Sequence, residues 1–335
     1  MKRVLVLILA VALVAGLTVS GSTQRPPKVG IVFDIGGLGD QSFNDSAYVG
    51  LKRLEKELGA QITYMESKTP SDYEPNLASL AREGYDVVWG IGFLMADAIK
   101  KVASQFPNTR FGIIDSEFTD EEYAALGNIL GVVYKEHEGS FLVGVLAALT
   151  TKTDKVGFVG GMQFAVIEKF EAGFKAGVWK TNPNIDILTN YTGSFDDPAK
   201  GKTVATSMFR QGADVVFHAA GATGIGVIEA AAELGKWAIG VDSNQAHLAP
   251  KNVLNSMIKR VDIGVFEGTK MLLEPDFKAH TMVMGIAEDG VGMVTDLSNN
   301  ASLSAIAKAQ EWAEKIKSGE YVVPETPPAK AADLQ

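Results

Sequence analysis

A strand, a helix and a second strand follow one another in residues 29–65, which read VGIVFDIGGLGDQSFNDSAYVGLKRLEKELGAQITYM. The apolar runs Val29–Phe33 and Ile62–Met65 have the length and the β-branched content of buried strands. Between them, apolar residues at helical spacing predict a helix over Phe43–Leu58. Because strand, helix and strand in this order form a right-handed crossover, the two strands should pair in parallel. This stretch therefore predicts an α/β fold built on a parallel sheet.

The same alternation continues along the chain and then starts again. Further strands of the first series are predicted at Val87–Gly90, Phe111–Ile114 and Ile129–Val133, with helices over residues 72–82 and 94–105. A helix over residues 136–148 separates the two series, and its small residues Gly139, Ser140 and Gly144 suit close packing. The second series has strands at 156–159, 185–191, 215–219 and 238–241 and helices at 167–180, 199–211 and 226–234. Two such series predict two doubly wound lobes, with a ligand cleft beyond the carboxyl ends of their strands.

The first residues have the layout of a secretory signal peptide. Lys2 and Arg3 precede an apolar run from Val4 to about Leu17, and small residues follow at 20–22. The run is shorter than the roughly 20 residues of a membrane-spanning helix, so we expect a signal peptide over residues 1–24 and an exported protein in the periplasm or at the outer face of the cytoplasmic membrane. Retention of the segment as an anchor is the alternative.

Composition excludes several classes of function. The chain contains no cysteine, which excludes thiolate catalysis, cysteine zinc sites and a lipobox cysteine for lipid attachment. The net charge of -9 occurs without a basic stripe, which argues against nucleic acid as a partner and favours a neutral or cationic small ligand. The four histidines are scattered without metal-ligand spacing, and we predict no cofactor and no metal.

Carboxylates follow the predicted strands in both halves. Asp34, Asp115 and Asp242 each stand where an apolar run meets a loop, and Asn44 and Lys259 occupy comparable positions. A carboxylate can accept hydrogen bonds from two vicinal hydroxyls, and a lysine can donate to a ring or hydroxyl oxygen. A single carboxylate at a strand end usually caps a helix, but three at equivalent ends favour a binding site for a hydroxylated solute.

Aromatic residues and glycines stand beside these polar residues. Phe43 and Phe195 lie in loop-like contexts that suit stacking on a flat ring, and Phe164 flanks the turn after Gly161. Phe170 has the spacing of a core residue. The loop that begins at Gly221 would let backbone N–H groups approach a neutral ligand.

Two glycine motifs suggest nucleotide binding at first sight. Residues 34–42 imitate a dinucleotide loop, but Asp34 and Asp40 would repel a pyrophosphate. The GKT at 201–203 lacks the earlier glycine of a phosphate loop, because Asp196 occupies that position. We therefore assign neither function.

Several segments together resemble the basic-membrane-protein family, and within it the purine nucleoside receptors of bacterial ABC importers. They are GDQSFND at 39–45, EGSFLVGVLAALTTKTDKVGFVGGM at 138–162, FEAGFKAGV at 170–178, AAGATGIGVIEAA at 219–231, GVDSNQ at 240–245 and SMIKRVD at 256–262. The resemblance implies a type I periplasmic-binding-protein fold with three crossovers at the hinge. Many members are lipoproteins, whereas this chain has no cysteine to acylate.

The resemblance also implies which residues contact the ligand. Asp242 and Lys259 would hold the ribose hydroxyls, and Asn44 and Asp115 would contact the edge of the base. Phe43 and a second-lobe aromatic residue would stack on its two faces. The full set of predicted site residues is Asp34, Phe43, Asn44, Asp115, Phe164, Phe195, Gly221, Asp242 and Lys259.

The order of the remaining elements completes the predicted domain division. A strand is expected at 253–258, a helix at 261–273, a strand-rich stretch at 281–294 and a helix at 303–317. The predicted N-terminal lobe comprises residues 28–135 and 254–277, the C-terminal lobe 136–242 and 281–320, the hinge crossovers 243–253 and 278–280, and a disordered tail 324–335.

The residues predict a monomeric protein, not an enzyme, that binds a neutral, flat, hydroxylated solute. The resemblance implies that this solute is a purine nucleoside and that the protein passes it to the permease of an ABC importer. A binding protein or sensor for a sugar or another small polar solute is the alternative, because such proteins use the same residue types. Nucleoside hydrolysis is a remote alternative, since the chain lacks the acidic cluster that would hold its metal near the first strand.

Overall fold

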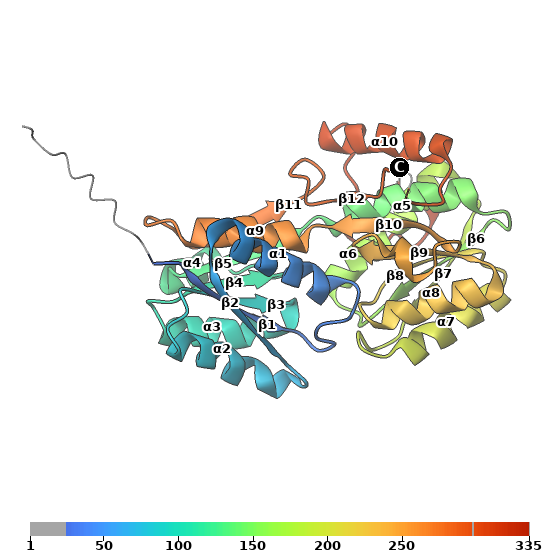
Figure 1. The fold of residues 1–335 in the computed structure, drawn as a ribbon. Helices are drawn as coiled ribbons and strands as arrows, with labels where there is room; N and C mark the ends of the chain where they lie inside the picture. Colours follow the sequence, from blue (N-terminus) through green and yellow to red (C-terminus); the bar gives the residue numbers. More distant parts are fainter. Residues whose placement is uncertain (1–24, 297, 335) are drawn as a thin grey trace, which may run out of the picture.

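The structure is a computed structural model that describes residues 25–296 and 298–334, so the predicted signal peptide lies outside the described residues. These residues form two six-stranded, mostly parallel sheets, each covered by helices on both faces (Figure 1). The strand order is β11-β5-β4-β3-β1-β2 in the first sheet and β12-β10-β9-β8-β6-β7 in the second. Apart from β11 and β12, the two orders correspond strand by strand, which confirms the prediction of two doubly wound lobes.

The first lobe contains the beginning of the chain and two later elements. Its strands and helices are β1 (Lys28–Phe33), α1 (Phe43–Leu58), β2 (Gln61–Glu66), α2 (Tyr73–Arg82), β3 (Val87–Ile91), α3 (Ala96–Gln105), β4 (Arg110–Ile114), α4 (Asp120–Leu126), β5 (Ile129–Tyr134), α9 (Val261–Leu272) and β11 (His280–Met284). The helix predicted over Phe43–Leu58 is α1 with the same bounds. The short helix α4 was not predicted, because its seven residues show little apolar periodicity; a capping box between Thr119 and Glu122 stabilises its start.

The second lobe contains the middle and the end of the chain. Its elements are α5 (Glu136–Thr150), β6 (Lys155–Gly160), α6 (Ala165–Thr181), β7 (Asp186–Tyr191), α7 (Pro198–Arg210), β8 (Val215–Ala219), α8 (Thr223–Leu234), β9 (Trp237–Asp242), β10 (Val253–Lys259), β12 (Val291–Met293) and α10 (Leu303–Lys317). Helix α5 is buried from Glu136 to Ala147 and packs against α6. A Cβ atom at Gly173 would lie 2.0 Å from the His137 carbonyl oxygen, so glycine permits this close packing.

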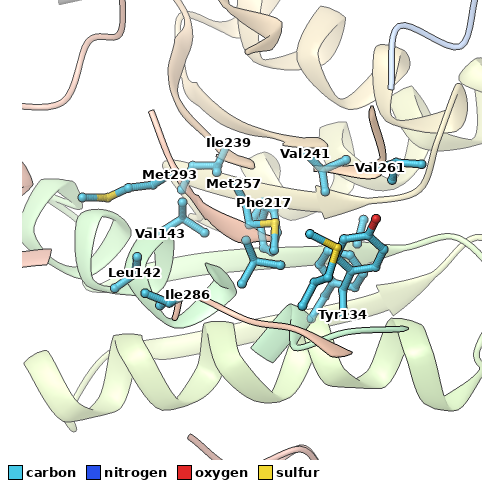
Figure 2. Packing of buried hydrophobic residues seen from close by; sticks show 14 of the residues in the cluster. Tyr134, Leu142, Val143, Phe217, Ile239, Val241, Met257, Val261, Ile286 and Met293 are labelled. Atoms are coloured by element: carbon cyan, nitrogen blue, oxygen red, sulfur yellow. The ribbon is translucent and has the colours of Figure 1, made fainter. Parts of the chain in front are cut away.

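The core of the second lobe continues to the boundary between the lobes. Apolar side chains from α5, β8, β9 and β10 interlock there, among them Val143, Phe217, Val241 and Met257 (Figure 2). Each of these side chains is buried, and Tyr134 at the end of β5 joins them from the first lobe. This packing holds the ends of the strands in place. It thereby also sets the positions of the residues that follow the strands.

The described chain passes between the lobes three times, as the three-crossover prediction required. The passages lie between β5 and α5, between β10 and α9, and between β11 and β12. The predicted positions of the later crossovers were wrong. Residues 243–253 form a loop inside the second lobe, because β10 pairs with β9, and residues 278–280 lead into β11, which pairs with β5 in the first sheet.

The domain boundaries change accordingly. Residues 254–259 belong to the second sheet, and residues 281–284 belong to the first sheet, the reverse of the prediction. Periodicity identifies a strand but does not reveal which sheet provides its hydrogen-bonding partner. The predicted disordered tail is also corrected over its described residues 324–334, because this segment packs along α6. There Glu325 pairs with Lys169 at 3.1 Å, and a 3₁₀ turn over Ala331–Leu334 contacts the helix.

Candidate functional site

A cavity of about 620 Å³, its mouth included, lies between the two lobes at the carboxyl ends of their strands. Eight of the nine predicted site residues line the cavity: Asp34, Phe43, Asn44, Asp115, Phe195, Gly221, Asp242 and Lys259. The ninth, Phe164, is not part of the lining; it is 44% exposed and contacts the lining residue Phe93, with ring centroids 5.0 Å apart.

Lys259 lies at the centre of the polar wall. Its side chain is 2% exposed, and its Nζ atom lies 2.7 Å from Asp115 Oδ2 and 3.0 Å from Glu136 Oε1. Burial favours the neutral amine, but the carboxylates of Asp115, Glu136 and Asp242 outweigh it and raise the pKa of Lys259 above its usual value. The ammonium has three N–H donors, of which one is hydrogen-bonded to Asp115, while the contact with Glu136 is an ion pair without a hydrogen bond. An N–H therefore remains for another partner.

Asp242 stands opposite, at the end of β9. It accepts a hydrogen bond from the Ser42 hydroxyl, which belongs to the first lobe. Burial raises the pKa of Asp242 to about 7, although Lys259 and Ser42 act to lower it. A ligand hydroxyl that donated to this carboxylate would stabilise its charged form.

Asp34 ends β1 in the first lobe. It accepts hydrogen bonds from the Tyr73 hydroxyl and, at 2.7 Å, from the Ile35 backbone N–H. Burial raises the pKa of Asp34 to about 6 against the effect of these bonds. Tyr73 and Ile35 therefore hold this carboxylate at the cavity wall.

Asp40 precedes α1, and Asn44 is the second residue of this helix. The Asp40 carboxylate accepts from the backbone N–H groups of Ser42, Asn44 and Asp45 at 2.9, 2.8 and 3.1 Å, as a residue at a helix N-terminus does. The Asn44 side-chain amide also donates to Asp40, at 3.1 Å. This bond orients Asn44, and its Oδ1 atom has no hydrogen-bond partner within the described part of the chain.

Aromatic rings supply the apolar walls. The Phe43 ring and the Phe170 ring lie 5.3 and 5.4 Å from Lys259 Nζ. Phe195 lies on the second lobe and meets Phe93 of the first lobe edge to face, with centroids 6.4 Å apart. Rings from both lobes therefore face one enclosed space.

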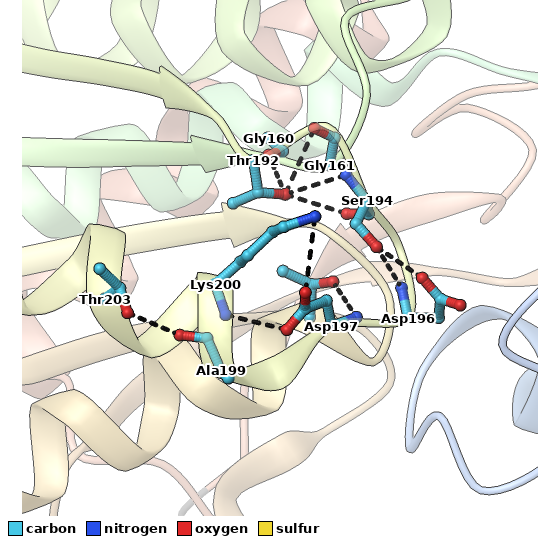
Figure 3. Close-up of polar contacts among 10 residues, drawn as sticks. Gly160, Gly161, Thr192, Ser194, Asp196, Asp197, Ala199, Lys200 and Thr203 are labelled. Atoms are coloured by element: carbon cyan, nitrogen blue, oxygen red, sulfur yellow. Dashed lines mark hydrogen bonds and ion pairs between the residues drawn. The ribbon is translucent and has the colours of Figure 1, made fainter.

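The loop that carries Phe195 is held by short-range hydrogen bonds (Figure 3). The Thr192 hydroxyl donates to the Ser194 carbonyl at 2.9 Å, and the Ser194 hydroxyl donates to Asp196 at 2.5 Å. The Phe195 carbonyl accepts from the Thr223 N–H at 3.1 Å. A Cβ atom at Gly161 would lie 2.2 Å from the Phe195 ring, so glycine is needed beside it.

The two lobes also contact each other through Gln41 of the first lobe. Its backbone carbonyl accepts from Gln245 Nε2 at 2.9 Å, and its side-chain oxygen lies 3.0 Å from His247 Nε2. Gln245 is itself buried and bonded to His218 at 3.0 Å. Together with the Ser42–Asp242 bond, these contacts define a closed arrangement of the lobes.

Several residues that line the cavity or lie behind its wall were not predicted. Phe93 lies in a 3₁₀ turn after β3, where an aromatic residue next to a predicted strand end was an available signal. Phe170 was interpreted as a core residue; it packs in the core and also lines the cavity. Glu136 was missed because a carboxylate at the start of an apolar helix is typical of helix capping.

The described residues contain no group of acidic residues and histidines arranged to hold a metal ion. None of the helices in residues 25–296 and 298–334 is both long enough and apolar enough to cross a membrane.

Two lobes of this topology, closed over one polar and aromatic cavity, define a bilobal solute-binding protein. A protein described as an ABC transporter solute-binding protein from Aeropyrum pernix has this fold, with a TM-score of 0.79, 28% identity and coverage of 89% of this chain and 94% of the other. The chain belongs to the Bmp family of PnrA-like ABC transporter substrate-binding proteins, whose model matches residues 28–327. The type I periplasmic-binding-protein fold is therefore confirmed, and the family binds substrates rather than transforming them.

Relatives with curated descriptions match over nearly the whole chain. The CD4+ T-cell-stimulating antigen of Listeria innocua is 38% identical, over 97% of this chain and 99% of its own length. Basic membrane protein D of Borreliella burgdorferi is 34% identical, over 97% and 95%. The ABC transporter nucleoside-binding protein BmpA of Lactococcus lactis is 36% identical, over 91% of each chain.

Proposed function

We propose that this chain captures a purine nucleoside between its lobes and delivers it to an ABC importer. The observation that carries the proposal is a pair of unused acceptors. In the described part of the chain, Asn44 Oδ1 and Asp115 Oδ1 are buried without hydrogen-bond partners, and both residues line the cavity. Buried acceptors are costly unless a ligand supplies donors, and the N–H groups along the edge of a purine are such donors.

Asp242 and Lys259 are suited to the ribose. The Asp242 carboxylate can accept from two vicinal hydroxyls, and the remaining N–H of Lys259 can donate to a hydroxyl or ring oxygen. Both groups are buried, so an analogue without the hydroxyls would leave them without these bonds. Phe43 and Phe195 are suited to stack on the base from the two lobes. Asp34 and Gly221 complete this proposed set of ligand contacts, and Phe164 supports it from outside through Phe93.

The charge of the cavity favours a nucleoside over a nucleotide. Among the described residues, four carboxylates line it, from Asp34, Asp40, Asp115 and Asp242, against the single ammonium of Lys259. That ammonium is already paired with two carboxylates. A phosphate would meet repulsion there without an arginine or a second lysine to balance it.

Delivery of the nucleoside to the importer would depend on the closed arrangement of the two lobes. The ligand stabilises the closed arrangement by bonding to both lobes, and a permease can recognise that arrangement on the outside of the membrane. The signal-like segment at residues 1–24 and the name of the Lactococcus lactis relative support this role. We expect the protein to act as a monomer, since its cavity draws on both lobes of one chain.

Native mass spectrometry of the freshly purified protein tests the proposal. We expect a fraction of the protein to carry a mass equal to adenosine, guanosine or inosine, lost on denaturation and refolding. A co-purified hexose or pentose would replace this function with sugar binding.

A further inference from the structure

Glu136 is a buried carboxylate behind the wall of the cavity. It is the first residue of α5, directly after the first passage between the lobes, and its side chain is 1% exposed. It does not line the cavity. Its Oε1 atom lies 3.0 Å from Lys259 Nζ, and apart from this ion pair neither of its oxygens has a hydrogen-bond partner within the described residues.

The ion pair joins the hinge to the binding wall. Lys259 is the last residue of β10, next to the second passage between the lobes, so the pair connects two of the passages. The same ammonium reaches Asp115 of the first lobe at 2.7 Å. A lysine ammonium on a flexible stem needs at least two fixed partners to hold its remaining N–H in one direction. Glu136 and Asp115 are those partners.

We propose that Glu136 is a positioning residue for ligand binding, which holds the Lys259 ammonium at the cavity wall without touching the ligand. The proposal rests on the proposed function in that a nucleoside serves as the probe. It gives a function to the buried carboxylate of Glu136, which does not itself contact the proposed ligand.

The surroundings of Glu136 give the proposal a pH signature. The titratable groups that face it are Lys259 on β10, Asp115 after β4 and Tyr134 on β5. Burial raises the pKa of Glu136 to about 7; Lys259 opposes this rise and Asp115 adds to it. Only the ionised carboxylate attracts Lys259 fully, so the contribution of Glu136 to affinity should grow as the pH rises through about 7.

Titration calorimetry with inosine on the purified full chain tests the proposal in three variants. Glu136→Gln removes the charge and Glu136→Asp keeps it. Glu171→Gln is the matched control, because Glu171 is a buried carboxylate paired with Lys175 at 2.5 Å outside the cavity lining. We expect Glu136→Gln to weaken binding by about tenfold at about pH 8 and less at about pH 6. Glu136→Asp should retain part of the affinity, and Glu171→Gln should match the parent.

A second measurement does not depend on the nucleoside. The side-chain ¹⁵N resonance of Lys259, assigned by its loss in Lys259→Met, should shift in ligand-free Glu136→Gln and not in Glu171→Gln. Parental affinity at both pH values in Glu136→Gln, or an unshifted resonance, overturns the proposal. If the parent binds no nucleoside but the resonance shifts, the proposed function fails and the positioning role stands. If Glu136→Gln does not fold, Glu136→Asp decides: an unshifted Lys259 resonance in that variant overturns the proposal.

Discussion

Asp115 and Asp242 occupy equivalent positions in the two lobes, at the carboxyl ends of β4 and β9, and both have a backbone φ of +66°. Left-handed backbone is unfavourable for residues with a Cβ atom, although aspartate tolerates it better than most. Such strain concentrates at functional sites. Both carboxylates act on the same group, because each of them raises the pKa of Lys259.

Replacing Asp242 with alanine should weaken nucleoside binding by at least about tenfold, because buried hydroxyls would lose their acceptor. Titration calorimetry measures the change. Asp154→Ala is the control, since Asp154 also has a positive φ, of 52°, but is exposed and remote from the cavity lining. An unchanged dissociation constant for Asp242→Ala would remove Asp242 from the site.

The stability of the ligand-free protein should fall as the pH rises from about 6.5 to about 8. This window lies above the range in which His137 and His218, whose pKa values burial lowers from 6.5 to about 4, would bind protons on unfolding. The folded-state pKa values of Asp34 and Asp242 are about 6 and about 7, above the value of 3.8 for a free aspartate. In this window these carboxyl groups bind more protons in the folded state than in the unfolded state, so rising pH favours unfolding through them. Thermal unfolding monitored by circular dichroism over this range tests the sign. Asp242→Asn should flatten the decline, and a parent that gains stability over the range contradicts the assignment.

Nucleoside binding should release protons near neutral pH. Ligand hydroxyls that donate to Asp242 favour its ionised form, and this lowers its pKa from about 7. Calorimetry in buffers of different ionisation enthalpy counts the protons. Proton uptake on binding would show that Asp242 is protonated in the complex and does not act as an acceptor carboxylate.

Replacing His247 with alanine should destabilise the closed arrangement by removing its contact with the Gln41 side chain, 3.0 Å away. Loss of one exposed hydrogen bond should weaken nucleoside affinity by at most about fivefold. The loss should appear mainly as faster dissociation of the nucleoside. Stopped-flow fluorescence can follow the dissociation. His280→Ala serves as the control, because this histidine is exposed on the first lobe and makes no contact across the cleft among the described residues. Equal dissociation rates in the two variants would show that Gln41 and His247 do not hold the closed state.

Replacing Gly173 with alanine should lower the free energy of unfolding by about 1–3 kcal/mol, because the new Cβ atom would meet the His137 carbonyl oxygen and force α5 and α6 apart. Urea denaturation measures the loss. The control is Gly292→Ala, where a Cβ atom would meet nothing within 4 Å among the described residues. Similar stability of the two variants would contradict the close packing of these helices.

The sequence was sufficient for most of the fold. Apolar runs and helical spacing predict the elements well, and the helices 43–58 and 303–317 have the predicted bounds. The lobe assignments of β10 and β11 failed, because membership of a sheet depends on hydrogen bonds to strands distant in the chain. The signal peptide prediction concerns residues that the structure does not describe.

The candidate site was predicted in part. Carboxylates at strand ends and loop aromatics led to eight residues that line one cavity. Phe170 was interpreted as core because a helical phenylalanine shows the same spacing whether its outer edge meets the core or a cavity. Glu136 gave no signal, since its importance comes from its burial and its distance to Lys259, which are properties of the folded chain alone.

Titration calorimetry of the refolded, ligand-free parent with adenosine, guanosine and inosine, beside ribose, glucose and inosine monophosphate, tests the central claim most directly. The account predicts saturable heat with at least one purine nucleoside and at least about hundredfold weaker binding of the free sugars and the nucleotide. Binding of ribose or glucose without heat from any nucleoside would contradict it.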